Sequence, residues 1–360
     1  IVALDLATGD LIWEVGNPFV SADYSPKANG RNINNPAMLR MLRRRGMVPQ
    51  TGRSWTVSAR GDVVYAMRPT ASGLEILAID VVTGKRLGKV PSATYSPSFI
   101  ESGAIASGMA ENGGRLYVAY ADSVGGGSRN RYGGGFEDAR MVCIDMQDPR
   151  RLQLLWDSKL YGRATGYHAY GGNQTVEAVH IPAAAEGSVF YNSNDGALVS
   201  LDAMTGEIQW AYSYEKFVQV NRRFGRNRGP QKEPPDPCFT ASPIVRDGQV
   251  FVAPSDAFSM YAFDTATGEP LWSQPREGLY YVVGLYNDLL IVHGERVEAR
   301  HWQTGEVAWT APVSGLEPAG KGCLAGDAVA VPVRRKTSRG FDDRIRSEER
   351  RVGKECVSEC

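Results

Sequence analysis

Several features that would point to a membrane or fibrous protein are missing from this sequence. None of its apolar runs approaches the roughly 18 residues that a membrane-spanning helix needs. Its 40 glycines and 20 prolines do not recur every third residue, which excludes a collagen-like chain. Basic and acidic residues both number 40, so the chain lacks the positive charge of a general nucleic-acid binder, and we expect no specific nucleic-acid partner.

The sequence also lacks the common catalytic and metal-binding motifs. It contains no Cys-x-x-Cys-His haem attachment motif, no Gly-x-Ser-x-Gly and no phosphate-binding loop. Its four histidines, at positions 168, 180, 293 and 301, do not have the spacing of metal ligands. We therefore assign no catalytic residue and no metal ligand from motifs. A hydrophobic content of 42% remains, which is enough for a packed core.

One short pattern recurs along the chain: small-x-Asp-x-x-Thr-Gly-x-x-x-Trp. Copies lie at residues 2–13, 77–88, 199–210, 261–272 and 298–309, with a degraded copy at 142–156. Alternating apolar residues before the Asp predict a strand, and the residues leading to the Trp predict a second one. Asp-x-x-Thr-Gly predicts a tight turn in which Asp binds backbone amides and Gly takes a positive φ. We expect each tryptophan ring to fill the space between neighbouring repeats.

Two further short apolar stretches precede most copies, the second of them led by Gly or Asp, as at 247–256. Each repeat therefore predicts four short antiparallel strands, and such units repeated around an axis are the blades of a β-propeller. We expect an all-β propeller with at least six blade units, five of them complete. The chain opens with the outer two strands of one blade and closes with the inner two of another.

The repeat frame resembles the tryptophan-docking repeat of the pyrroloquinoline-quinone (PQQ) family of propellers. The copies at 2–13 and 261–272 match at all five defined positions. The copy at 77–88 has Gly88 in place of the tryptophan, and the last copy has His301 in place of the Asp. The resemblance covers residues 1–335. It implies the fold and not an activity, because this motif stabilises blades.

We expect residues 1–335 to form one propeller domain and residues 336–360 to form a tail outside it. Because the chain starts and ends inside a blade, we expect a window onto a ring of seven or eight blades; a six-bladed ring closed by the two half-blades is the alternative. Residues 346–356, RSEERRVGKEC, resemble a translated sequencing-library adapter. We therefore expect residues 346–360 to be artefactual, with a natural charged tail as the alternative.

Four insertions interrupt the repeats, at residues 14–54, 122–139, 157–173 and 213–238. The second lies between a blade's second and third strands, and the others follow a blade's fourth strand. Because strands alternate in direction, both kinds of connection emerge on one face, opposite the Thr-Gly turns. Loops on a rigid scaffold commonly carry function, so we expect this inserted face to bind a protein partner or a small molecule.

Two of these insertions are basic. Residues 35–46 predict a short helix that Asn35 caps and Gly46 ends. We expect the basic loops to attract an anionic partner, such as an acidic polymer, a lipid headgroup or a protein; solvated loops are the alternative. Their basic residues are Arg40, Arg43, Arg44 and Arg45 in the first, and Lys216, Arg222, Arg223, Arg226, Arg228 and Lys232 in the second.

The segment 161–180 is the best small-molecule candidate, because it leads into the innermost strand of a blade beside the central channel. Arginine and aromatic rings suit a planar, acidic ligand such as PQQ. Packing of these aromatics on a neighbouring blade is the alternative. The candidate cofactor-binding residues are Arg163, Tyr167, His168, Tyr170, Asn173 and Gln174.

The resemblance also implies what an alcohol-oxidising PQQ enzyme would carry: a vicinal Cys-Cys pair, calcium ligands and a catalytic Asp. No vicinal pair occurs, and Cys143 is expected to be a small core residue of a third strand. We therefore expect a non-catalytic binding or scaffold propeller of an exported bacterial protein, periplasmic or otherwise extracytoplasmic, similar to the BamB-like lipoproteins of barrel assembly. A PQQ-dependent oxidoreductase that holds PQQ with calcium is the main alternative, and a sensor module of a larger exported protein is the third.

Overall fold

The computed structural model describes thirteen segments of the chain, and every regular element in them is a β-strand. Among these residues there is no helix long and apolar enough to cross a membrane. The helix predicted at 35–46 lies outside the described residues. The described segments are 2–4, 11–14, 27–28, 31–32, 56–70, 73–90, 105–124, 135–165, 181–194, 196–217, 242–313, 316–337 and 340–349.

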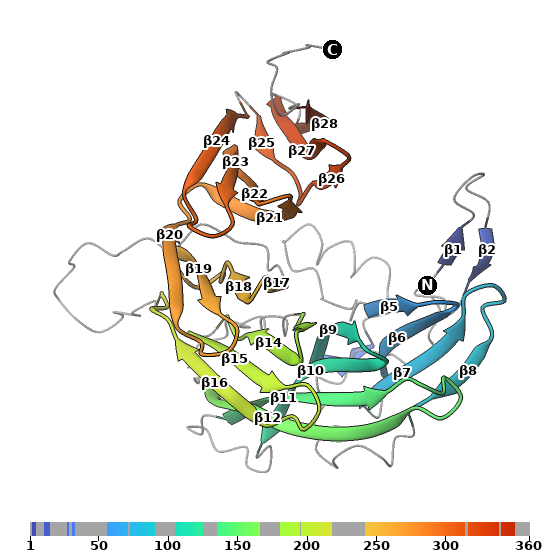
Figure 1. Cartoon of the computed structure of the whole chain (residues 1–360). Helices are drawn as coiled ribbons and strands as arrows, with labels where there is room; N and C mark the ends of the chain where they lie inside the picture. The colour runs from blue at the N-terminus through green and yellow to red at the C-terminus, as the bar shows by residue number, and fades with distance from the viewer. Residues whose placement is uncertain are drawn as a thin grey trace. The chain divides into compact units, whose positions relative to one another are not determined.

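Five four-stranded antiparallel sheets form the body of the fold, and in each the order of the strands is their order in the chain (Figure 1). These are the five complete blades that the repeats predict, so the all-β propeller class is confirmed. Their strands are β5 (Thr56–Arg60), β6 (Val63–Thr70), β7 (Gly73–Asp80) and β8 (Arg86–Lys89); β9 (Ile105–Asn112), β10 (Arg115–Val124), β11 (Gly135–Asp145) and β12 (Gln153–Thr165); β13 (Ala183–Ala185), β14 (Ser188–Asn192), β15 (Ala197–Asp202) and β16 (Ile208–Ser213); β17 (Ile244–Arg246), β18 (Gln249–Val252), β19 (Ser259–Asp264) and β20 (Pro270–Pro275); and β21 (Leu279–Tyr286), β22 (Leu289–Gly294), β23 (Arg296–His301) and β24 (Val307–Pro312).

Shorter pairings lie outside these five blades. A hairpin near the N-terminus pairs β1 (Val2–Leu4) with β2 (Leu11–Glu14), as expected of the outer strands of a blade. Two-residue strands β3 (Lys27–Ala28) and β4 (Arg31–Asn32) pair within the first insertion. The chain divides into two compact units, residues 1–187 with 202–207 and residues 188–201 with 208–360.

The last sheet extends further along the chain than the sequence predicts. It contains β25 (Glu317–Pro318), β26 (Cys323–Ala325) and β27 (Ala328–Thr337), and β28 (Gly340–Glu349) pairs with β27 over its whole length. A polar segment can complete such a ladder because the pairing uses backbone groups, whatever the side chains are. The artefactual origin of residues 346–360 stays a prediction.

Strands also take up part of two segments that the sequence assigns to insertions. Residues 122–124 of β10 pair with 136–138 of β11, and β11 pairs with β12 as far as Thr165. The pairing extends the second blade beyond its tryptophan on the inserted face. Residues 125–134 and 166–180 between these strands lie outside the described part of the chain.

A tryptophan of one repeat contacts the Thr-Gly turn of the next. Its indole N–H donates to a turn carbonyl: Trp13 to Val81 (2.7 Å), Trp156 to Ala203 (3.3 Å), Trp210 to Thr265 (2.9 Å) and Trp272 to Trp302 (3.1 Å). The ring also lies against the turn glycine, where an added Cβ would come within 2.6 Å of a ring carbon at Gly268 and Gly305. Glycine is therefore required for close approach as well as for positive φ.

The small residue of the frame lies opposite the tryptophan on the neighbouring strand. Ala262 is paired with Trp272, Ser200 with Trp210 and Cys143 with Trp156. Cys143 is fully buried, as predicted for a core residue of a third strand, and burial raises the pKa of its thiol to about 12. A small side chain here leaves room for the indole.

The contact between the repeat at 77–88 and the repeat at 142–156 departs from this pattern in both repeats. Gly88 replaces the tryptophan, and the turn that it meets belongs to the degraded repeat, which has no Thr-Gly pair. A Cβ at Gly88 would collide with the carbonyl oxygen of Pro149 and lie 3.0 Å from the Cα of Arg150. The Pro149–Arg150 backbone thus fills the space that a tryptophan occupies in the other repeats.

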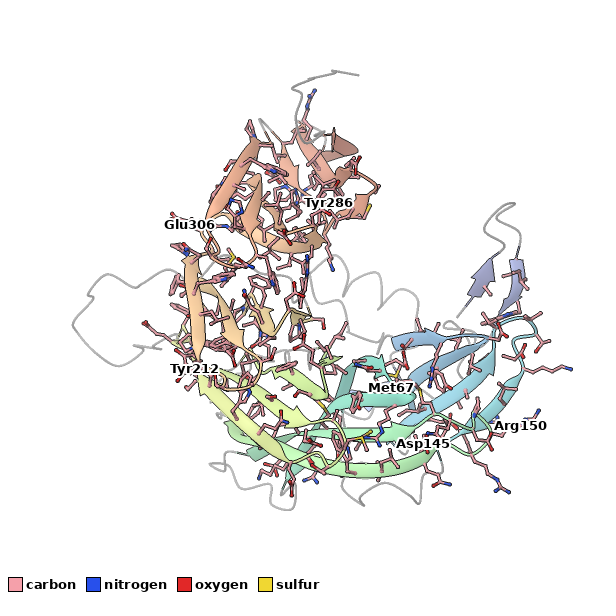
Figure 2. All side chains as sticks on the ribbon, in the orientation of Figure 1. Met67, Asp145, Arg150, Tyr212, Tyr286 and Glu306 are labelled. Atoms are coloured by element: carbon pink, nitrogen blue, oxygen red, sulfur yellow. The ribbon has the colours of Figure 1, made fainter. Side chains whose placement is uncertain are left out.

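The repeated aspartates stabilise their own turns. Asp264 Oδ1 accepts hydrogen bonds from the backbone N–H groups of Ala266 (2.9 Å) and Thr267 (2.8 Å) and from the Thr267 hydroxyl (3.0 Å). These bonds, the backbone bond of Thr267 first, lower the pKa of Asp264 below its ordinary value. In the last repeat His301 replaces the Asp, and Gly305 N–H donates to the His301 carbonyl at 2.8 Å. Figure 2 labels Glu306, next to this turn.

Candidate functional site

The residues predicted to bind a small molecule lie almost entirely outside the described residues. Arg163 is placed, in β12 opposite Glu137 of β11. Of the predicted basic residues, Lys216 is described and exposed, just after β16. The predicted residues outside the described part are Tyr167, His168, Tyr170, Asn173 and Gln174 in the small-molecule site, and Arg40, Arg43, Arg44, Arg45, Arg222, Arg223, Arg226, Arg228 and Lys232 in the basic loops. The small-molecule site and the anionic partner therefore stay predictions.

The described residues instead show a buried polar cluster on the inserted face, within the second compact unit. It lies at the β14–β15 and β18–β19 connections, which join a blade's second and third strands, and at the end of β16. We call it the corner cluster. Its members are Asn192, Ser193, Asn194, Tyr214, Ser255 and Asp256.

Asn194 joins the corners of two consecutive blades. Its Oδ1 accepts the backbone N–H of Ser255 at 2.6 Å and the Ser255 hydroxyl at 3.2 Å. The Asn192 amide donates to the same oxygen at 3.4 Å, and Asn192 Oδ1 accepts the N–H of Asn194 at 3.4 Å. Both asparagines are buried, with 2% and 4% of their surface exposed. The amide groups thus hold the connection of one blade against that of the next.

Tyr214 closes the cluster from the end of β16. Its hydroxyl oxygen lies 3.0 Å from Asn192 Oδ1 and 3.1 Å from Asp256 Oδ1, and its single proton can be donated to one of them at a time. Burial, followed by the negative charge of Asp256, raises the pKa of Tyr214 far above its ordinary value. Tyr214 is therefore a neutral hydrogen-bond donor throughout the physiological pH range.

Two properties of Asn194 distinguish it from an ordinary structural amide. Its φ is +46°, in the left-handed region that Asn tolerates better than most residues. Its Nδ2 group is buried, and within the part of the chain that the structure describes it has no hydrogen-bond partner. A buried donor without a partner costs about 1–3 kcal/mol, so this N–H can donate to an oxygen atom of water or of a bound ligand.

Removing the Tyr214 hydroxyl tests how tightly the corner is held. Tyr214→Phe is expected to cost about 1–2 kcal/mol, because it leaves Asn192 Oδ1 and Asp256 Oδ1 with one donor fewer in a buried site. Urea denaturation would measure the loss. Tyr212→Phe is the matched control: Tyr212 is two residues earlier, in β16, its partly exposed ring packs on Phe263 of β19 at 4.7 Å, and its hydroxyl has no hydrogen bond among the described residues. Equal losses for both variants would contradict the assignment.

A buried ion triad lies on β23. Glu298, 3% exposed, accepts from Arg300 Nε at 2.8 Å and from the side chain of Arg296. Arg300, 6% exposed, also donates to the Gly305 carbonyl at 3.0 Å. The carboxylate therefore neutralises a guanidinium that cannot lose its proton, next to the turn on which Trp272 packs.

A third polar group lies in the second blade. Arg140 Nε donates to the Tyr120 hydroxyl and to Asp157 Oδ1, both at 3.0 Å, and Tyr120 donates to Asp157 Oδ2 at 3.0 Å. Burial, then the charge of Asp157, raises the pKa of Tyr120. All three side chains satisfy one another, which is typical of a structural network. Within the described residues, no group of three or more His, Cys, Asp and Glu side chains could hold a metal ion.

The corner cluster is a site that the sequence analysis missed. A signal for it was present, because Ser-Asn at 193–194 and Ser-Asp at 255–256 both lie nine and eight residues before the aspartate of their repeat. This offset marks equivalent corners. It does not predict that Asn194 contacts Ser255, since that contact depends on how two blades pack.

The model of one protein family matches the blades. It is described as outer membrane protein assembly factor BamB, and it covers residues 72–226 and 144–345 of this chain. The chain belongs to this family of PQQ-repeat propellers. The predicted resemblance to PQQ-repeat propellers is thus confirmed, whereas the role of the chain remains to be proposed. No curated protein matches the sequence.

Solved structures similar to this BamB-family chain include a BamB and several dehydrogenases. BamB from Moraxella catarrhalis is 19% identical, with 82% of this chain and 76% of that chain covered and a TM-score of 0.46. A europium-containing methanol dehydrogenase is 11% identical, with coverage of 77% and 61% and a TM-score of 0.45. Quinohemoprotein alcohol dehydrogenase from Comamonas testosteroni is 14% identical, with coverage of 78% and 51% and a TM-score of 0.42. This chain spans about half to three fifths of the two dehydrogenases.

Proposed function

We propose that this chain is a non-catalytic binding or scaffold propeller of the BamB family. It acts in the periplasm or another extracytoplasmic compartment and holds a protein partner of outer-membrane assembly on the inserted face. The observation that supports this most is Asn194, whose Oδ1 joins two blade corners while its buried N–H has no partner. A corner held rigid in this way suits a surface that binds a partner without chemistry, and an acceptor group that enters the cluster would satisfy the buried N–H.

The surroundings of the corner cluster suit contact with a protein. Phe258, 36% exposed, follows Asp256 in the β18–β19 connection, and its ring lies edge-on to Phe217 at 5.9 Å. Phe217 N–H donates to the Asp256 carbonyl at 2.6 Å, which fixes this aromatic pair next to the cluster. Partly exposed aromatic rings held by a rigid backbone are common anchors in protein interfaces.

Site-specific photo-crosslinking tests this function. A benzophenone side chain is introduced at Phe258 on the inserted face. The control position is Glu269, next to the Thr-Gly turn between β19 and β20, on the opposite face. In bacterial envelope extract, the probe at 258 is expected to give a discrete adduct with an outer-membrane assembly protein, and the probe at 269 to give none. Adducts at both positions, or at 269 alone, would contradict binding through the inserted face.

The alternative function is oxidation by PQQ with calcium. The described residues include no carboxylate cluster that could hold calcium. Five of the six candidate cofactor residues lie outside the described part of the chain, so we assign no described side chain to PQQ or to calcium. PQQ and calcium added to the purified protein should leave dye-linked alcohol oxidation at background. Turnover above background would replace the scaffold proposal with an oxidoreductase.

A further inference from the structure

A histidine is buried near the end of β22, within the second compact unit. His293 has none of its surface exposed, and neither ring nitrogen has a hydrogen-bond partner among the described residues. It stacks on Tyr281 of β21, with ring centroids 5.7 Å apart and planes at 27°. A neutral imidazole has one donor and one acceptor nitrogen, and both are left without a partner here.

The position of His293 is an interior position in every complete blade. In each complete blade, the residue after the repeat Asp (or after His301) donates its backbone N–H to a carbonyl just before the second strand. In the last blade, His293 is the fifth residue after that carbonyl. The equivalent residues in the other four blades are Met67, Ala119, Asn192 and Ala253, all buried. Three of these are apolar, and Asn192 has polar partners. His293 alone in this set is polar without a partner.

His293 lies at the packing interface between the last complete blade and the final sheet. It is on the same face of β22 as Ile291, which packs with Val297, Val331 and Val333. β22 also contacts β25. His293 is therefore on the face of β22 that packs towards the final sheet, stacked on Tyr281 of β21 and opposite Val297 of β23.

The charged and titratable groups near the imidazole do not compensate a positive charge. From β21 it meets Tyr281, on which the charge of Arg334 acts. β25 and β27 contribute the Glu317–Arg334 pair, 3.3 Å apart, which is neutral as a whole and has side chains 45% and 39% exposed. Opposite His293 on β23 is Val297, and the Glu298 triad lies on the other face of that strand. Glu295, in the adjoining connection, is exposed and accepts from Tyr280.

We propose that His293 is an acid-sensitive latch that, when neutral, keeps the β21–β24 blade packed on the β25–β27 sheet and, when protonated, loosens that packing. This goes beyond the proposed binding function and does not depend on it. Burial lowers the pKa of His293 to about 4, from an ordinary value of 6.5. The unfolded or opened chain therefore takes up a proton near pH 6.5, whereas the packed form resists it.

The direction of the pH effect follows from this difference. The stability that depends on neutral His293 is fully present above about pH 6.5 and falls as the pH drops towards 4. Below pH 4 this group causes no further change in stability. Between pH 7.5 and 5, linkage predicts that the equilibrium constant for opening rises about 30-fold.

The test compares the full-length protein with two variants. His293→Met places the residue of the equivalent position, Met67, in the core, and His301→Gln removes an exposed histidine as the control. Between pH 7.5 and 5, the equilibrium constant for urea unfolding should rise about 30-fold less in His293→Met than in wild type. In His301→Gln it should rise by the same factor as in wild type. The Ala319 amide bonds to the Pro332 carbonyl of β27. Its protection factor, which compares its hydrogen-exchange rate with the intrinsic rate at the same pH, should fall between pH 7.5 and 5 in wild type and His301→Gln but not in His293→Met.

Several results would overturn the latch. The first is an acid response in His293→Met equal to that of wild type. The second is an Ala319 amide whose protection does not change between pH 7.5 and 5. If His293→Met does not fold, His293→Leu and the titration of His293 by NMR in the wild-type protein decide the question, since a pKa near 6.5 would rule the latch out.

Discussion

Replacing Glu298 by glutamine is expected to destabilise the fold by about 3–5 kcal/mol. Arg300 is 6% exposed and is neutralised by Glu298 at 2.6 Å, and Arg296 bonds to the same carboxylate. Glutamine preserves the shape and removes the charge, so a buried guanidinium remains without its counter-ion. The free energy of unfolding from urea titration at pH 7.5 measures this loss.

Asp288→Asn is the control for this prediction. Asp288 pairs with Arg246 at 3.0 Å, but its side chain is 84% exposed, so its replacement is expected to cost about 0–1 kcal/mol. Both substitutions change an acidic residue into its amide. A loss for Glu298→Gln no larger than for Asp288→Asn would show that the triad contributes little to stability.

The second large effect is expected at the turn glycine on which a tryptophan packs. Gly268 has φ +73°, and a Cβ there would lie 2.6 Å from Cδ2 and Cε3 of Trp210. Gly268→Ala therefore combines left-handed backbone strain, about 1–2 kcal/mol, with displacement of the indole, about 1–3 kcal/mol. Thermal unfolding followed by tryptophan fluorescence would report both the stability and the environment of the ring.

Gly248 provides a control with the same backbone conformation. Its φ is also +73°, but a Cβ there would meet no atom within 4 Å. Gly248→Ala should therefore show the strain alone, about 1–2 kcal/mol. The difference between the two variants measures the contact with Trp210. If the two lose equal stability, the close approach of ring and glycine does not contribute.

The sequence alone predicted the blades, because their information is local. The alternation before Asp264, the turn at Thr267–Gly268 and the strand ending at Trp272 are each specified by neighbouring residues. Repetition made each copy support the others. Cys143 could be assigned to the core for the same reason, since its place in the frame is that of Ala262.

The contacts that depend on packing between blades could not be predicted. Asn194 and Ser255 are 61 residues apart, and nothing in either segment indicates which corner it meets. His293 reads as one polar residue in an apolar strand, and its isolation follows only from what surrounds it. The sequence assigns residues 157–173 to an insertion, whereas β12 continues to Thr165. Its last five residues, Tyr161–Thr165, have no apolar alternation and pair through their backbone.

The paired departure at Gly88 and Pro149–Arg150 limits how this chain can be re-engineered. Consensus design would restore tryptophan at position 88, since the other repeats favour it. Here that single change would force an indole onto a backbone that already occupies the space. The two segments fit each other and not the consensus, so they can be exchanged or redesigned only together. Recombination that separates residues 77–88 from 142–156 should yield chains that do not fold.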